Sequence, residues 1–93
     1  MGFSDCGIYY RLMAKSLHTP EYDYFRALMV AARERSGLTQ ADVSARMGRP
    51  QSFVSKYESG ERRLDVLEFV QVCSALEADP QAIITDLQTG AKS

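Results

Sequence analysis

The sequence predicts an all-α fold of five helices in one domain of 93 residues. Apolar residues recur at three- and four-residue spacing along most of the chain, which is the period of an amphipathic helix. Proline and glycine stand where these helices would begin and end. The sequence has no alternating run of β-branched residues and no Asn-Gly or Asp-Gly turn, the patterns that mark strands and hairpins.

Composition excludes several classes of protein. Hydrophobic residues make up 45% of the chain and charged residues 25%, which is ordinary for a globular domain and unlike a disordered chain. No apolar run approaches the roughly 18 residues that a membrane span needs, and no secretory signal is visible at the N-terminus. Two cysteines and a single histidine offer neither a disulfide framework nor a metal site, so we expect a cytoplasmic protein without a cofactor.

The first helix is predicted to start at Pro20, with Thr19 as its N-cap, because proline suits the first position of a helix. Gly37 is the expected end, as a C-terminal glycine. Helical spacing places five residues on one apolar face: Tyr24, Phe25, Leu28, Met29 and Ala32.

Two short helices are expected next, over residues 40–47 and 51–59. Thr39 caps the first of them, and Asp42 follows three residues later as a variant of the capping box. Gly48 ends this helix, Pro50 suits the first turn of the next one, and Gly60 closes that.

The last two helices open near Asp65 and at Pro80. For the fourth helix we predict an inward face of Leu67, Val70, Cys73 or Ser74, and Leu76. For the fifth, the apolar residues are Ile83, Ile84 and Leu87. The domain is therefore expected over residues 20–88, with residues 1–19 as an N-terminal extension, unless Met13 is the native start, and residues 89–93 as a flexible tail.

Residues 40–59 have the geometry of a helix-turn-helix, in which two short helices meet at a glycine turn. Ser44 supplies the small side chain needed where the helices cross, and Gly48 tolerates the positive φ of the turn. Val54 and Tyr57 are spaced to pack the second helix on the first.

The stretch from Leu38-Thr39-Gln40 to Tyr57-Glu58-Ser59-Gly60 resembles the Cro and CI phage-repressor family, also called the XRE family of regulators. The resemblance covers about residues 24–87. It implies a five-helix, lambda-repressor-like fold that binds operator DNA, generally as a dimer, with the second helix of the motif in the major groove. Two residues depart from the family pattern: Ser44 replaces the usual alanine, and Phe53 stands where a small polar residue is common. Phe53 would cover thymine methyl groups or fill a gap in the packing.

The resemblance also implies roles for individual residues. The positions that contact bases are Gln51, Ser52, Ser55 and Lys56. The chemistry is consistent, since glutamine pairs with adenine and lysine with guanine. The positions that contact phosphates are Gln40, Arg62 and Arg63, with Arg49 in the turn as a further candidate. Arg33 and Glu58 match a partly buried, structural salt bridge.

The distribution of charge agrees with a DNA partner more than the net charge of −1 does. Residues 33–63 hold seven basic and four acidic side chains, whereas residues 64–93 hold one basic and five acidic. The middle of the chain is therefore suited to face a polyanion, and its C-terminal part is not.

The sequence thus predicts a sequence-specific regulator, most simply a repressor, that binds a pseudo-palindromic operator in double-stranded DNA as a homodimer. Ile83, Ile84 and Leu87 either form the dimer interface or close the core. An antitoxin-type module with a protein partner, or a restriction–modification controller protein, are the alternatives. Neither a phosphate-binding glycine loop nor a nucleophile–histidine–carboxylate set is visible, so no enzyme is expected.

Overall fold

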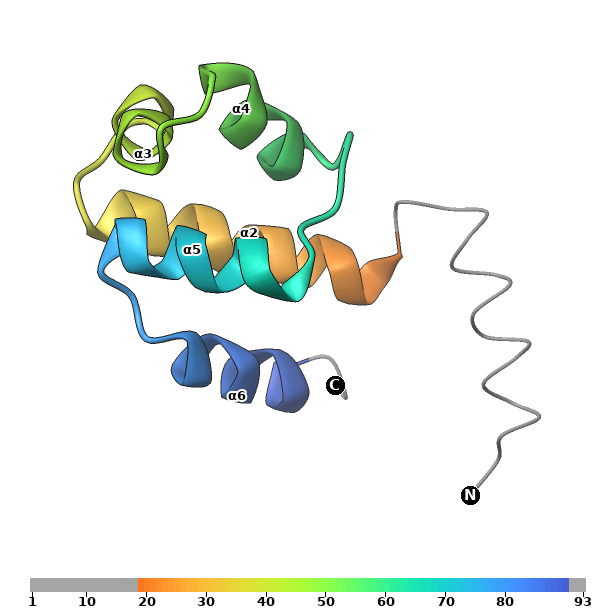
Figure 1. Ribbon diagram of the computed structural model, residues 1–93. Helices are drawn as coiled ribbons and strands as arrows, with labels where there is room; N and C mark the ends of the chain where they lie inside the picture. The colour runs from red at the N-terminus through yellow and green to blue at the C-terminus, as the bar shows by residue number, and fades with distance from the viewer. Residues whose placement is uncertain (1–18, 91–93) are drawn as a thin grey trace.

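Five helices follow one another along residues 19–90, the part of the chain that the computed structural model describes (Figure 1). They are α2 (Pro20–Arg35), α3 (Gln40–Met47), α4 (Gln51–Ser59), α5 (Val66–Leu76) and α6 (Pro80–Gly90). No strand occurs among these residues, so the all-α prediction is confirmed. In Figure 1, α3 and α4 lie on one side of α2 and α6 lies on the other.

The predicted boundaries differ from the structure at the C-terminal end of the domain. Helix α6 continues to Gly90, two residues beyond the predicted end of the domain at residue 88. No proline or earlier glycine interrupts it, and the Thr89 hydroxyl donates a hydrogen bond to the Thr85 carbonyl at 2.9 Å. Most of the predicted extension, including the alternative start Met13, lies outside the described residues.

Reciprocal side-chain caps fix where α3 and α5 begin. Thr39 accepts a hydrogen bond from the Asp42 amide at 3.0 Å, and the Asp42 carboxylate accepts one from the Thr39 amide at 2.9 Å. Asp65 and Glu68 repeat this arrangement at 2.7 and 3.0 Å. Each box satisfies amide groups that the first turn of a helix leaves unpaired.

Left-handed residues end α3 and α5. Gly48 has a φ of 66° and forms the turn between α3 and α4, as the sequence predicts. Glu77 ends α5 with a φ of 57° although it is not a glycine, and no local pattern in the sequence predicts this. A side chain in this conformation costs about 1–2 kcal/mol.

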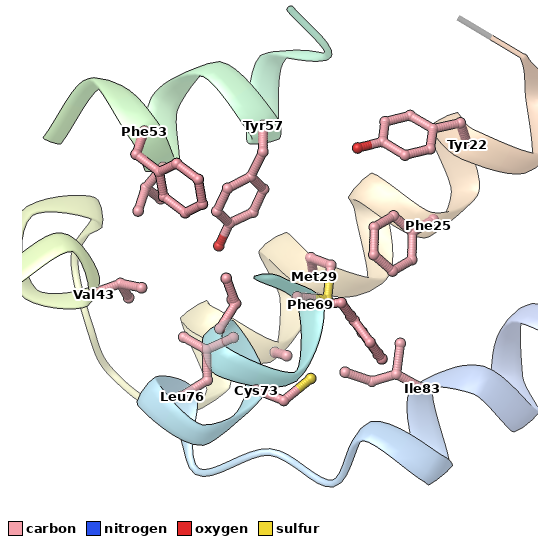
Figure 2. Close-up of a cluster of buried hydrophobic side chains, with 13 residues drawn as sticks. Tyr22, Phe25, Met29, Val43, Phe53, Tyr57, Phe69, Cys73, Leu76 and Ile83 are labelled. Carbon is pink, nitrogen blue, oxygen red and sulfur yellow. The ribbon is translucent and has the colours of Figure 1, made fainter. Parts of the chain in front are cut away.

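All five helices contribute side chains to one core, drawn in Figure 2. The ring of Phe25 on α2 lies 5.5 Å from that of Tyr22 and 5.5 Å from that of Phe69 on α5. The largest fully buried side chains are Tyr57, Met29, Leu76, Val43, Val54, Val72 and Cys73. The aromatic contacts join α2 to α5, and α3 packs against both α4 and α5.

The predicted inward face of α5 was partly wrong. Leu67 and Val70 are 74% and 49% exposed. The structure confirms Cys73 and Leu76 as buried, and it buries Phe69 and Val72 in place of Leu67 and Val70. Both sets have helical spacing, and the one that contains the aromatic ring of Phe69 removes more apolar area from water and meets Phe25.

One side chain predicted on the inward face of α2 is also exposed. Tyr24 is 37% exposed because it sits at the edge of the α2 stripe, where its ring lies against Gly90 of α6. A side chain at position 90 would collide with that ring. Ala41 is exposed in the first turn of α3, while Val43 and Ser44 supply the buried face of this helix.

Candidate nucleic-acid interface

The unit of α3, Gly48 and α4 is held together by four buried side chains. Val43 and Ser44 of α3 are 0% and 2% exposed, and Val54 and Tyr57 of α4 are 0% and 1% exposed. Helix α3 packs closely on α4. The small Ser44 therefore lies in the crossing, as the sequence predicts, and the pair has the geometry of a helix-turn-helix.

Helix α4 separates buried from polar side chains. Its inner face is formed by Phe53, Val54, Tyr57 and Glu58. Its outer face holds Gln51, Ser52 and Lys56, which are exposed, and Ser55, which is half-buried. The Ser55 hydroxyl donates to the Ser52 carbonyl at 3.2 Å. The structure thus brings all four predicted base-contacting residues to one face of one helix.

A buried ion pair ties α4 to α2. The Arg33 Nε donates to Glu58 Oε2 at 2.7 Å and Nη2 donates to Oε1 at 3.1 Å. Their side chains are only 15% and 6% exposed. Gln40 of α3 donates to the same carboxylate at 2.9 Å, so one of its two amide N–H groups is engaged within the protein. The hydrogen bonds to Glu58 raise the pKa of Arg33.

Tyr22 of α2 anchors the loop after α4, which comprises residues 61–65. Its hydroxyl accepts a hydrogen bond from the Leu64 amide at 3.2 Å and donates to the Arg62 carbonyl at 3.4 Å. The Arg63 guanidinium lies 4.4 Å from the centre of the Tyr22 ring. Burial raises the pKa of the Tyr22 phenol, which therefore stays protonated and able to donate. The sequence does not reveal this role because the partners are about 40 positions apart.

Four side chains form what we call the Phe53 cluster: Arg49, Phe53, Arg62 and Glu68. The two guanidinium groups lie 4.4 and 5.0 Å from the centre of the Phe53 ring. The ring itself is 7% exposed and meets the Tyr57 ring edge-on at 5.7 Å. Phe53 therefore fills the packing, which was one of the two alternatives. Hydrogen bonds from Arg62 lower the pKa of Glu68. The sequence predicts no functional role for this residue, although the Asp65-x-x-Glu68 spacing of a capping box marks it.

The predicted apolar patch on α6 is smaller than expected. Ile83 is 4% exposed and belongs to the core, which confirms for this residue the second of the two alternatives. Leu87 is half-buried against the same core, and Ile84 is 42% exposed. The apolar side chains at the start of α5 are more exposed than Ile84: Val66 is 76% and Leu67 is 74% exposed.

Other kinds of site have little support in the described part of the chain. Residues 19–90 bring no group of histidine, cysteine, aspartate and glutamate side chains together for a metal ion. None of their helices is long and apolar enough to cross a membrane. Burial raises the pKa of the Cys73 thiol to about 11, so it stays protonated and poorly nucleophilic at neutral pH.

Known proteins share this architecture. The helix-turn-helix domain family matches residues 25–83. The structure of an XRE-family like protein from Pseudomonas syringae pv. tomato str. DC3000 is 45% identical, covers 82% of this chain and 93% of its own, and superposes with a TM-score of 0.75. The chain belongs to the XRE family of helix-turn-helix regulators. No curated protein sequence matches it significantly.

A more distant structure with a similar fold is the clp gene regulator ClgR from C. glutamicum. Its TM-score is 0.68 at 16% identity, over 78% of this chain and 95% of that one, which shows the fold alone. The comparisons thus confirm two predictions from the sequence, membership of the XRE family and the five-helix fold. In this XRE-family chain, the helix-turn-helix is residues 40–59, as the sequence indicated.

Proposed function

We propose that this XRE-type DNA-binding regulator is a repressor that occupies a pseudo-palindromic operator as a homodimer. The observation that carries the proposal is the outer face of α4, where polar side chains stand clear of the core. An α-helix fits the major groove of B-DNA, and its side chains then reach the base edges. A protein bound there prevents other proteins from binding the same DNA, and we therefore favour repression.

Base contacts are proposed for Gln51, Ser52, Ser55 and Lys56. Phosphate contacts are proposed for Gln40, Arg49, Arg62 and Arg63. The division follows position: the first set lies on the outer face of α4, and the second flanks that helix at the start of α3, in the turn and in the loop after α4. Flanking cations fix the register of a reading helix without selecting a sequence.

The dimer follows from the size of the reading surface. One short helix contacts few base pairs, and operators of this kind use two half-sites about one helical turn apart. The acidic residues Glu77, Asp79 and Asp86 lie on α6 and the segment before it, away from α4 in the fold (Figure 1). Their position supports an orientation in which α4 faces the DNA.

Selection of bound duplexes from a random DNA pool tests this function. We expect two half-sites in inverted repeat, with an affinity that falls steeply as salt rises because phosphate contacts release counterions. An enriched single half-site would keep the DNA role and remove the dimer. No enrichment at any salt concentration would contradict DNA binding and favour the antitoxin-type alternative, in which a protein is the main partner.

We propose that the exposed apolar start of α5, rather than α6, forms the dimer contact, so a glutamate introduced there is expected to produce monomers. Leu67 is 74% exposed, and Val66 and Val70 close to it on α5 are exposed as well, whereas Ile84 on α6 is 42% exposed. We therefore expect Leu67→Glu to weaken dimerisation more than Ile84→Glu. Burying one leucine side chain is worth about 1.5–3 kcal/mol. Sedimentation equilibrium of the two variants measures the difference. A larger effect of Ile84→Glu would place the contact on α6.

A further inference from the structure

Arg49 and Arg62 flank opposite ends of α4, yet both side chains reach Glu68 of α5. Arg62 donates from Nη1 and Nη2 to the two carboxylate oxygens at 3.2 Å each. The Arg49 Nη1 lies 3.6 Å from Glu68 Oε2, within ion-pair distance. Two positions that the sequence treats as separate phosphate contacts therefore belong to one cluster, with the Phe53 ring beneath both guanidinium groups.

The cations and the anion of the Phe53 cluster differ in exposure. The side chains of Arg49 and Arg62 are 37% and 38% exposed, whereas that of Glu68 is 12% exposed. The carboxylate is thus less accessible than the guanidinium groups to a ligand that approaches from solvent. It also accepts the Asp65 amide at 3.0 Å as part of the capping box, which fixes its position at the start of α5.

The cluster keeps binding capacity after Glu68 is paired. A guanidinium has five N–H donors, and the hydrogen bonds from Arg62 to Glu68 use two of them. Two cations with one carboxylate leave one positive charge in excess. Phosphate oxygens accept hydrogen bonds from arginine readily, and two guanidinium groups fixed on one ring are oriented before DNA arrives.

We propose that Arg49 and Arg62 form a single composite phosphate-binding site, and that Glu68 is a positioning residue that holds both guanidinium groups and limits the site to one excess positive charge. This rests on the proposed DNA binding. Glu68 keeps non-specific affinity low, because a contact to phosphate strengthens binding to every sequence alike. Selectivity is then set by the outer face of α4.

The substitution Glu68→Gln tests the negative charge of this side chain without removing the capping hydrogen bond that it accepts. The glutamine carbonyl still accepts the Asp65 amide, while the negative charge opposite the arginines is lost. We expect the slope of log K against log salt for random-sequence DNA to steepen by about 0.9, the value for one additional phosphate contact. If the variant and the wild type bind equally well at 1 M salt, the steeper slope makes the variant bind random DNA about eightfold more tightly at 0.1 M salt. Discrimination between the selected operator and random DNA should not increase.

Glu77→Gln is the matched control. It removes the same charge from an Arg–Glu pair at the other end of α5, where Glu77 is 80% exposed and lies 3.4 Å from Arg46. Its slope should equal that of the wild type. A purely structural role of Glu68 would lower DNA affinity together with the midpoint of urea unfolding and would not steepen the slope, so that outcome overturns the proposal.

The reverse variant, Arg49→Gln, should flatten the slope relative to the wild type even if Glu68→Gln folds poorly. An unchanged slope in both variants would also overturn the composite site. If the wild-type protein itself bound no DNA, the proposed function would fail first, and that failure is visible before any variant is compared.

Discussion

Glu58→Ala is expected to destabilise the domain by about 3–5 kcal/mol, because it leaves the buried Arg33 guanidinium without its counter-ion. Arg33 retains only its hydrogen bond to the Leu38 carbonyl at 2.9 Å. Gln40 loses its acceptor in the same step. Since domains of this size have unfolding free energies of roughly 5–15 kcal/mol, the loss removes a large part of the total stability. Urea unfolding followed by circular dichroism measures it.

Two comparison variants show whether the cost comes from the unpaired charge. Glu61→Ala removes an exposed carboxylate, which accepts a hydrogen bond from the Ser59 hydroxyl at 3.1 Å. This variant should change the free energy of unfolding by less than about 0.5 kcal/mol. The double variant Arg33→Met/Glu58→Leu removes both charges and should cost less than Glu58→Ala. A loss below about 1 kcal/mol in Glu58→Ala would contradict a structural role of the ion pair.

Local signals were enough to predict the helix-turn-helix. Helices α3 and α4 begin and end at the predicted residues because a capping box, Pro50 and two glycines lie at these boundaries. The outer face of α4 also follows directly from helical spacing. The caps and turns that determine this part of the structure involve residues adjacent in the sequence, so the sequence alone is enough to predict it.

Tertiary contacts decided what the sequence could not. Two apolar stripes on α5 have the same spacing, and the choice depends on Phe69 meeting Phe25, which lies 44 positions away along the chain. The sequence marks Glu68 only as the second residue of a capping box, and the fold alone brings Arg49 and Arg62 to it. The sequence therefore does not predict the contacts of the Phe53 cluster, whereas it does predict which side chains lie on the outer face of α4.

Loss of single side chains on α4 should affect selectivity, whereas loss of a flanking cation should affect affinity for all DNA. We expect Gln51→Ala and Lys56→Ala each to reduce discrimination between operator and random DNA by about 1–3 kcal/mol, the worth of one specific base contact. Both side chains are exposed on the outer face of α4, so stability should change little. Competition titrations with operator and random duplexes measure the ratio.

Arg63→Ala provides the contrasting result. Arg63 belongs to the loop after α4, and its guanidinium lies over the Tyr22 ring of α2. Affinity for operator and random DNA should fall alike, and the salt slope should decrease by about one unit. Equal losses of specific and random binding in Gln51→Ala would instead make this residue a phosphate contact. Selectivity would then have to come from Lys56, the remaining long side chain on that face, or from the sequence-dependent shape of the DNA.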